Sequence, residues 1–387
     1  MGQETRQVHR IACTNCGEDM VVALHVDYDK IESWAEAVEN AEEVPEEVGA
    51  PVVNVDANFV IPAELRHQDR VFPRVLQMHG IVEKLEKEGR LATRSMSEIM
   101  LDERSFRRPD FEEEWRALKT AWSLYRRGKD HLLADRLSAA SEQFYKSEKL
   151  DDVPDWVFRF LTSMSGLEYG KLWNNVADKM KPLMRPNVFS GFLTHYGKTV
   201  DQRSERYFSI AKSYFANYSD FGQVHFYAGR GDDLPEDSHV TSNNFDATKM
   251  FYGDCFEIFS SSVDILAMFS NMLAGRPFDK FERLELKAYL RLDKAGRFAA
   301  VEAVPEFAAL CAEHDNKLRN ASHHGGTKFN ATSQMVAYRH GKGGSGEEQK
   351  ISYGEYLLRS SRIFLQTMTL LRYELLMCNV TGMRPPL

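Results

Sequence analysis

Residues 352–375, SYGEYLLRSSRIFLQTMTLLRYEL, carry the pattern on which the expected fold depends. Ser352 and Glu355 stand three residues apart, which is the spacing of a capping box at a helix start. The residues that follow on one face are mostly apolar and recur at three- and four-residue steps: Leu357, Ser361, Phe364, Met368, Leu371 and Leu375. This periodicity predicts a long amphipathic helix near the end of the chain.

Two more helices are expected before it. For a helix over 246–274, Asp246 stands at the N-cap and Gly275 directly after the end. A helix over 306–324 is expected because Pro305 precedes it, Gly325 follows it and apolar residues recur along one face. We therefore expect a helical bundle over residues 201–387. Helical patterning also predicts a helical middle region over 81–200.

The N-terminal part has a different character. Residues 11–26 and 52–61 are rich in β-branched side chains, as strands are, and a very acidic stretch over 27–47 separates them. We expect residues 1–80 to form a small module that contains a Cys-x-x-Cys turn and a β-hairpin. The whole chain is then mainly α, with some β at its N-terminal end.

The turn contains Cys13 and Cys16, whose thiolates could bind Zn²⁺. Two cysteines are half of a tetrahedral site, and the remaining ligands would come from His9, His25 or elsewhere in the chain. Their spacing matches no common zinc finger. A structural zinc site and a plain turn both stay open, and we favour the plain turn.

Near the C-terminal end, Arg319-Asn320-Ala321-Ser322-His323-His324 brings together a fixed cation, an amide and two imidazoles. An imidazole can take a proton from a ribose 2′-hydroxyl or give one to a leaving oxygen, while a guanidinium binds the phosphate. On the expected helix, Arg319, Asn320, His323 and His324 point away from the apolar face. About 140° separates Arg319 from His324, so a composite site in a homodimer would bring both to one phosphate.

The string Arg319-Asn320-x-x-x-His324 resembles the R-[polar]-x3-H signature of the HEPN superfamily, over at most the last half of the chain. HEPN proteins are small helical bundles, and many are metal-independent ribonucleases that dimerise to build the active site. The resemblance implies a phosphate clamp at Arg319, a general acid/base at His324, hydrogen bonding by Asn320 and an auxiliary role for His323. It also implies cleavage without a cofactor to a 2′,3′-cyclic phosphate and a 5′-hydroxyl. The biological role it implies is a toxin or anti-phage effector with an antitoxin or sensor partner.

Carboxylates interrupt the apolar pattern of the helix expected over 246–274. Asp254, Glu257 and Asp264 form a polar line among aromatic residues. In some HEPN proteins an acidic residue on an earlier helix holds the motif arginine. Two interpretations of the polar line stay open: one of these three carboxylates holds Arg319, or the line is an ordinary solvated face.

The net charge of −8 and the pI of about 5.9 argue against a broadly basic nucleic-acid-binding protein. RNA binding would have to be local. Around the motif the sign of the charge reverses, and Lys317, Lys328 and Arg339 are the candidate RNA contacts. The N-terminus has no secretory pattern and no apolar run is long enough to span a membrane, so we expect a cytoplasmic protein.

Two functions remain open from the sequence. One is an endoribonuclease that acts on RNA as a homodimer. The other is a non-catalytic HEPN-like module that binds a partner protein or a nucleic acid through the same polar helix end. The motif fits both.

Overall fold

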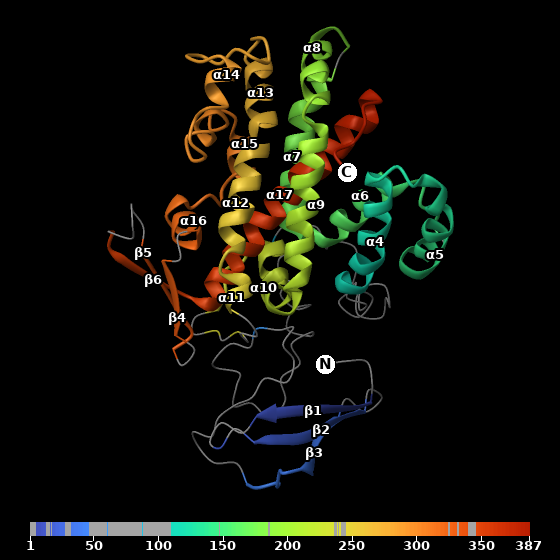
Figure 1. Ribbon diagram of the computed structural model, residues 1–387, viewed down its shortest axis with the longest axis vertical. Coiled ribbons are helices and arrows are strands. Elements are labelled where there is room, and N and C mark those ends of the chain that lie inside the picture. Colours follow the sequence, from blue (N-terminus) through green and yellow to red (C-terminus); the bar gives the residue numbers. More distant parts are fainter. Residues whose placement is uncertain are drawn as a thin grey trace.

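The computed structural model describes residues 5–12, 16, 18–27, 32–45, 60, 87, 110–146, 148–184, 186–235, 238, 240, 245–323, 326–330, 333–339 and 346–387. This part of the chain is mainly α-helical with a small antiparallel sheet at its N-terminal end, which confirms the expected fold class (Figure 1). The helices described before residue 231 are α4 (Phe111–Arg126), α5 (Ala134–Tyr145), α6 (Val153–Met164), α7 (Gly166–Met180), α8 (Pro186–Gly197), α9 (Val200–Ala216) and α10 (Tyr218–Arg230). Those after it are α11 (Phe245–Thr248), α12 (Phe251–Ser262), α13 (Asp264–Leu273), α14 (Leu286–Tyr289), α15 (Pro305–Leu310), α16 (Asn316–His323) and α17 (Tyr353–Thr381), and the short 3-10 helices are η2 (Asp130–Leu132), η3 (Lys181–Leu183) and η4 (Phe298–Ala300).

The N-terminal sheet has the strand order β1 (Arg6–Ala12), β2 (Asp19–Asp27), β3 (Glu32–Glu39). The first two strands form the expected hairpin, but β3 lies in the acidic stretch that the sequence suggested was a spacer. One acidic side chain of β3, that of Glu36, is accommodated by contacts with residues of the other two strands. Glu36 accepts a hydrogen bond of 2.6 Å from His25, which lowers the pKa of Glu36, and lies 3.3 Å from Arg6. The second strand expected over 52–61 falls, apart from Val60, outside the described residues.

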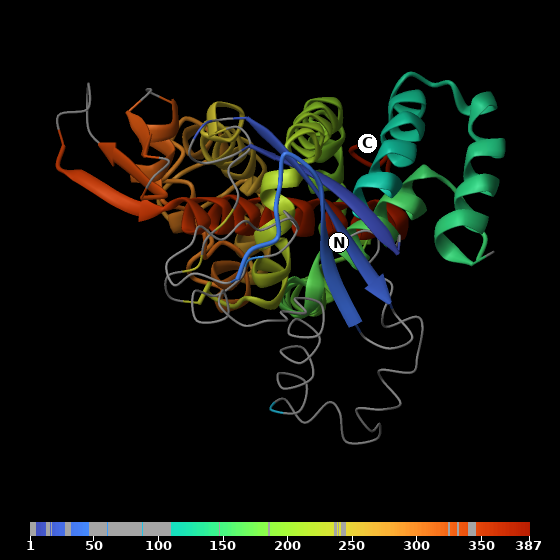
Figure 2. The same ribbon diagram turned by 90° about the horizontal axis from the view of Figure 1, so that it is seen from below.

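α17 is the central element of the helical part. Figure 2 shows it crossing the molecule from the C-terminal sheet at one end to α4 and α6 at the other. The Ser352 side chain caps it by accepting a hydrogen bond of 3.0 Å from the Glu355 N–H, as the sequence predicted. It ends before Gly382, which has a φ of +69°. The amphipathic pattern expected for α17 was wrong, because neighbouring helices bury it on almost every side, including Gln366 and Arg372.

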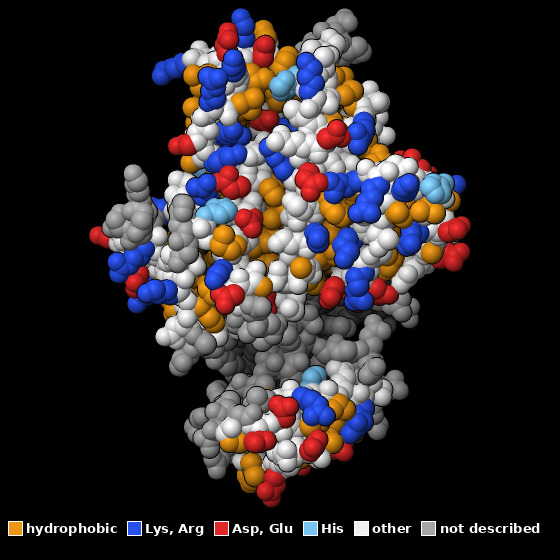
Figure 3. Space-filling model, in the orientation of Figure 1, with side chains coloured by type: hydrophobic (Ala, Val, Ile, Leu, Met, Phe, Trp, Pro, Cys, Tyr) orange, Lys and Arg blue, Asp and Glu red, His pale blue; other side chains and the backbone are white. Residues whose placement is uncertain are grey.

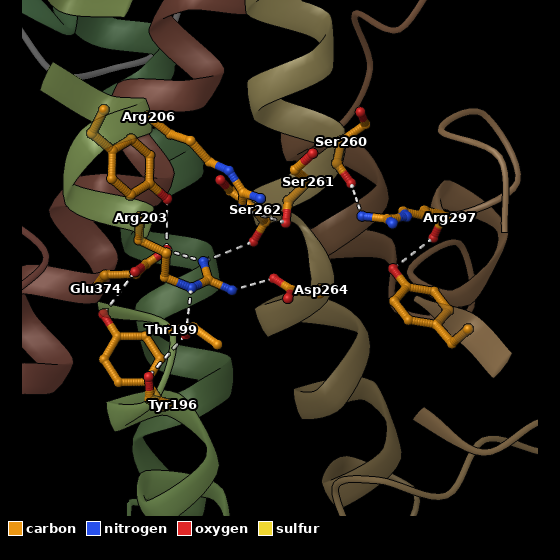
Figure 4. Close-up of polar contacts among 12 residues, drawn as sticks. Tyr196, Thr199, Arg203, Arg206, Ser260, Ser261, Ser262, Asp264, Arg297 and Glu374 are labelled. Carbon is orange, nitrogen blue, oxygen red and sulfur yellow. Dashed lines mark hydrogen bonds and ion pairs between the residues drawn. The ribbon is translucent and has the colours of Figure 1, made fainter. Parts of the chain in front are cut away.

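The helix expected over 246–274 is divided into α11, α12 and α13, and Gly275 ends it with a φ of +73°. The division between α12 and α13 lies at Val263. A helix end leaves its last carbonyl groups without intrahelical partners. Three arginines donate to three successive carbonyls here, Arg203 to Ser262 (3.2 Å), Arg206 to Ser261 (3.5 Å) and Arg297 to Ser260 (3.3 Å) (Figure 4).

Arg203 is also the centre of a buried ion network. Its guanidinium, 1% exposed, contacts Asp264 and lies 2.8 Å from Glu374 on α17. Glu374 also accepts hydrogen bonds from the hydroxyls of Tyr196 (2.7 Å) and Tyr207 (2.6 Å). These charges are removed from water, so each depends on its partners for compensation. The network thereby ties α8, α9, α13 and α17 together.

One hydrophobic core joins the helices on both sides of residue 200. Trp122 and Trp156 from the expected middle region belong to the same buried cluster as Phe259 and Leu371 from the expected C-terminal bundle. Within the described part of the chain, no helix combines the length and the apolar character that crossing a membrane would require.

Replacing Arg203 tests the buried network. The substitution Arg203→Met leaves Asp264 and Glu374 buried without a cation, so we expect the free energy of unfolding to fall by about 3–5 kcal/mol. The matched control is Arg384→Met, since Arg384 forms an exposed pair with Asp201 (2.8 Å) and such pairs contribute at most about 1 kcal/mol. Urea denaturation of both variants measures the difference. Equal losses would contradict the account of the network.

Candidate active site

The motif helix α16 begins at Asp315. The carboxylate of Asp315 accepts hydrogen bonds from the backbone N–H groups of Lys317 (2.7 Å) and Leu318 (3.1 Å), as an N-cap does. Arg359 on α17 lies 3.0 Å from the same carboxylate. Burial opposes ionisation of Asp315, but the Leu318 N–H and Arg359 outweigh it, so the pKa of Asp315 is lowered.

The prediction of a single helix over 306–324 was wrong. α15 ends at Leu310, and residues 311–315 are not helical. Side chains from other helices bind the backbone of this segment. Gln366 on α17 bonds both the N–H (2.7 Å) and the carbonyl (3.0 Å) of Glu313, and the Tyr252 hydroxyl on α12 accepts from the Asp315 N–H (2.8 Å). These tertiary contacts outweigh a helical pattern that is correct in isolation.

α16 packs against α12 along a polar seam. Arg319 contacts Glu257, and four residues later His323 contacts Gly253 and lies 4.0 Å from Asp254. The later residue of α16 thus contacts the earlier residue of α12, so the two helices run antiparallel. Arg319, Asn320 and His323 are half-buried and lie at the edge of the core. The expectation that they point away from the apolar face is therefore met only in part.

Of the three carboxylates proposed to hold Arg319, Glu257 is the one in contact with it. Arg319 Nε donates to Glu257 Oε1 at 2.7 Å, and Nη2 contacts the same oxygen. Arg319 Nη1 donates to Asn320 Oδ1 at 2.6 Å. Asp264 does not take part, because its carboxylate is paired with Arg203. The arginine is therefore fixed on two sides by neighbours from the motif itself and from α12.

His323 lies over Gly253, where a Cβ atom would come within 2.9 Å of the imidazole atoms Cδ2 and Nε2. The glycine thus makes room for the ring. His323 Nε2 is buried and makes no hydrogen bond within the described residues, since Asp254 Oδ1 at 4.0 Å is too distant. Burial raises the pKa of Asp254, Glu257 raises it further, and His323 opposes the shift.

His324, the motif histidine selected by spacing, lies outside the described residues. The expected RNA contacts are exposed but do not form one group. Lys317 lies on the first turn of α16, Lys328 on β4 (Thr327–Asn330), and Arg339 on β5 (Met335–Arg339). Arg339 lies 3.5 Å from Glu348, which is on the next strand, β6 (Glu348–Ser352).

This second sheet was not predicted, because its strands are short and its connections are rich in glycine. It has the order β4-β5-β6, and all its strand pairs are antiparallel. Val336 and Tyr338 on β5 point inward and are buried. The sheet therefore covers one end of α16.

Lys294 is a site residue that the sequence did not single out. Its Nζ lies 3.8 Å from Glu257 Oε2 and contacts Ser261 Oγ, so Glu257 bridges Lys294 and Arg319. Lys294 comes from the segment between α14 and η4. The sequence around Lys294 carries no motif, so this residue could not be told apart from an ordinary surface lysine.

The candidate metal site is only partly visible. Cys16 is exposed and has a free thiol, whereas Cys13 lies outside the described residues. Among the residues that the structure describes, no three His, Cys, Asp or Glu side chains gather as metal ligands would.

No family model, no curated protein and no solved structure matches this chain. The site therefore has to be interpreted from its own geometry. A guanidinium held between a carboxylate and an amide, beside an imidazole and within reach of a lysine, is equipped to bind a phosphate and to move a proton near it.

The contact between Gly253 and His323 is tested by adding one methyl group. Gly170→Ala on α7 meets no atom within 4 Å and is expected to stabilise the protein by about 0.5–1 kcal/mol. Gly253→Ala should not gain this stability, because its Cβ forces the imidazole aside. Urea denaturation gives the two free energies, and the histidine ring signals in NMR spectra report the displacement. An equal gain in both variants, with unchanged ring signals, would show that the glycine is not needed.

The N-cap of α16 predicts a pH-dependent loss of stability. The pKa of Asp315 is lower in the folded than in the unfolded protein, so its contribution is present above the unfolded pKa of about 3.9 and is lost as pH falls through the folded value. We expect Asp315→Asn to lower the free energy of unfolding by about 1 kcal/mol at neutral pH. At a pH below the folded-state pKa of Asp315 it should lower it by nearly nothing. Denaturation at both pH values measures this. The control is the exposed Asp246→Asn, and a cost for Asp315→Asn that is the same at both pH values would refute the assignment.

Proposed function

We propose that this chain is a metal-independent endoribonuclease that cleaves RNA to a 2′,3′-cyclic phosphate and a 5′-hydroxyl. The observation that supports this most is the contact of Arg319 with Glu257 and Asn320, four residues before His323 on the same helix. An arginine fixed in this way is already oriented when the substrate arrives. Orientation before binding is what makes electrostatic stabilisation of a transition state effective.

Arg319 keeps donors for a substrate. A guanidinium has five N–H groups. The contacts with Glu257 and Asn320 use three of them, one each on Nε, Nη1 and Nη2. The two remaining N–H groups are available to the oxygens of one phosphate, and charge-assisted hydrogen bonds of this type are strong.

The reaction that we propose is an internal transfer at phosphorus. The ribose O2′ attacks, so that the P–O2′ bond forms and the P–O5′ bond breaks. One proton leaves O2′ and one reaches O5′, and His324 is the general acid/base, with His323 in an auxiliary role. Arg319 binds the phosphate oxygens as their negative charge grows, and Asn320 keeps the guanidinium in place. No step needs a metal ion.

The proposal includes a homodimer, in which the motif helices of two chains build one site. It also includes a biological role as a toxin or anti-phage effector with an antitoxin or sensor partner. Both parts rest on the resemblance of the motif to that of HEPN ribonucleases. Size-exclusion chromatography with and without RNA tests the first part, because a strict monomer under both conditions cannot form a composite site.

Cleavage of total RNA and tRNA in excess EDTA tests the activity. We expect the wild-type protein to cleave and both Arg319→Gln and His324→Ala to lose at least about a hundredfold in rate, because each removes charge stabilisation or proton transfer. His323→Ala should lose less. The product ends are identified by their resistance or sensitivity to enzymes that act on cyclic phosphates.

The matched control is His131→Ala, which removes an exposed histidine on η2. Its rate should equal that of the wild type. Equal rates in the wild type and in His324→Ala would show that the activity belongs to another site or a contaminant. If RNA is bound but never cleaved, the alternative of a non-catalytic RNA-binding module takes the place of the ribonuclease.

A further inference from the structure

A second group of cations lies next to Arg319. Arg206 on α9 and both Lys294 and Arg297, between α14 and α15, meet around Ser260 and Ser261 at the end of α12. Figure 4 shows Arg206 and Arg297 approaching these serines from opposite sides. Figure 3 shows Lys and Arg side chains gathered on the face that carries the break between α12 and α13. Glu257 links this group to Arg319, because it contacts both Lys294 and Arg319.

The positive charge of this group is not balanced. Within the described part of the chain, neither Arg206 nor Arg297 forms an ion pair, and Glu257 is shared between Lys294 and Arg319. Arg297 is only 9% exposed, and its Nη1 and Nη2 donate to the neutral carbonyls of Ser260 (3.3 Å) and Leu290 (2.6 Å). Its Nε is buried and makes no hydrogen bond among the described residues. Buried charges are normally paired, so a buried arginine with an unused donor points to a missing anion.

The cations also repel one another. Burial lowers the pKa of Lys294, and Arg297, Arg206 and Arg319 lower it further against the opposing effect of Glu257. Burial likewise lowers the pKa of Arg206, and Arg203 and Arg297 lower it further against the opposing effect of Asp264. A bound anion would relieve this repulsion. The group is reachable from solvent, since the Lys294 side chain is 28% exposed and Arg206 is half-buried.

We propose that Arg206 and Lys294, with Arg297 behind them, bind a second phosphate of the RNA strand, next to the phosphate bound by Arg319. The Ser261 hydroxyl holds the Lys294 ammonium group and donates its own proton to the Glu257 carbonyl (2.6 Å), and the backbone carbonyls of Ser260 and Ser261 fix the guanidinium groups. Two neighbouring phosphate sites would set the position of the strand across the α12–α16 seam. This inference rests on the proposed function for the identity of the anion.

Binding of a non-cleavable RNA tests the subsite separately from catalysis. The probe is a short fluorescein-labelled RNA with 2′-O-methyl riboses, which lacks the attacking hydroxyl. Fluorescence anisotropy gives its affinity over a series of salt concentrations. We expect Arg206→Gln and Lys294→Met each to weaken binding about tenfold and to reduce the slope of log affinity against log salt by about one.

Two matched controls remove charge elsewhere. Lys119→Met on α4 replaces a half-buried cation and Arg136→Gln on α5 an exposed one, and both should leave affinity and slope unchanged. Unfolding midpoints separate binding from a structural role. Lys294→Met should be as stable as the wild type or more so, because it removes a charge that burial and neighbouring arginines disfavour. A structural lysine would instead lower the midpoint when replaced.

The outcomes distinguish this subsite from the catalytic proposal. Loss of affinity in both variants with a stable fold supports the subsite, and it does so even if the wild type cleaves no RNA. Affinities equal to that of the wild type, or no binding of the probe by the wild type, would overturn it. Adenosine 5′-monophosphate is the competitor that identifies the source of the phosphate. If it binds as tightly as the RNA and depends equally on Lys294, the site belongs to a free nucleotide and the inference is wrong.

Discussion

The interruption of the α12–α13 helix at Val263 is the constraint on which the surrounding structure depends. It releases the carbonyl groups of the buried residues Ser260, Ser261 and Ser262, and each of these carbonyls needs a donor. Arg203, Arg206 and Arg297 supply these donors from α9 and from the segment after α14. Arg203 then needs Asp264 and Glu374, which fixes α17 relative to α9. The same contacts hold the end of α12 in place, and they thereby orient Gly253, Asp254 and Glu257 toward α16.

The local signals in the sequence correctly predicted the start of α17 and the end of α13, but not the start of α11, where Asp246 lies in the first turn instead of at the N-cap. Ser352 caps α17 and Gly275 ends α13, as their residue types predict. The break after Leu310 was not predictable in this way. It depends on Gln366 and Tyr252, which lie far along the chain and bond backbone groups that a helix would otherwise use. Sequence spacing does not contain such contacts.

The candidate site was predictable only in part, for the same reason. The resemblance to HEPN proteins implied that a carboxylate on an earlier helix would hold Arg319, and the polar line of an apolar helix offered three carboxylates for this role. Only the antiparallel packing of α12 and α16 selects Glu257, and only the Arg203 network removes Asp264. Lys294 was missed because it approaches Glu257 from a segment without periodic pattern. A site assembled from separate elements leaves no motif in any one of them.

Stability alone does not account for the cations around Ser260 and Ser261. Carbonyl groups at a helix end are satisfied as well by neutral donors or by water as by arginine. Placing Lys294 beside Arg206 and Arg297 adds repulsion, and the pKa of Lys294 is lowered first by burial and further by these arginines. A chain of net charge −8 repels a polyanion at long range, so binding to one requires a local region of opposite sign. Arginines held by carbonyls provide that region with a fixed orientation, because each carbonyl occupies one donor and leaves others for a phosphate.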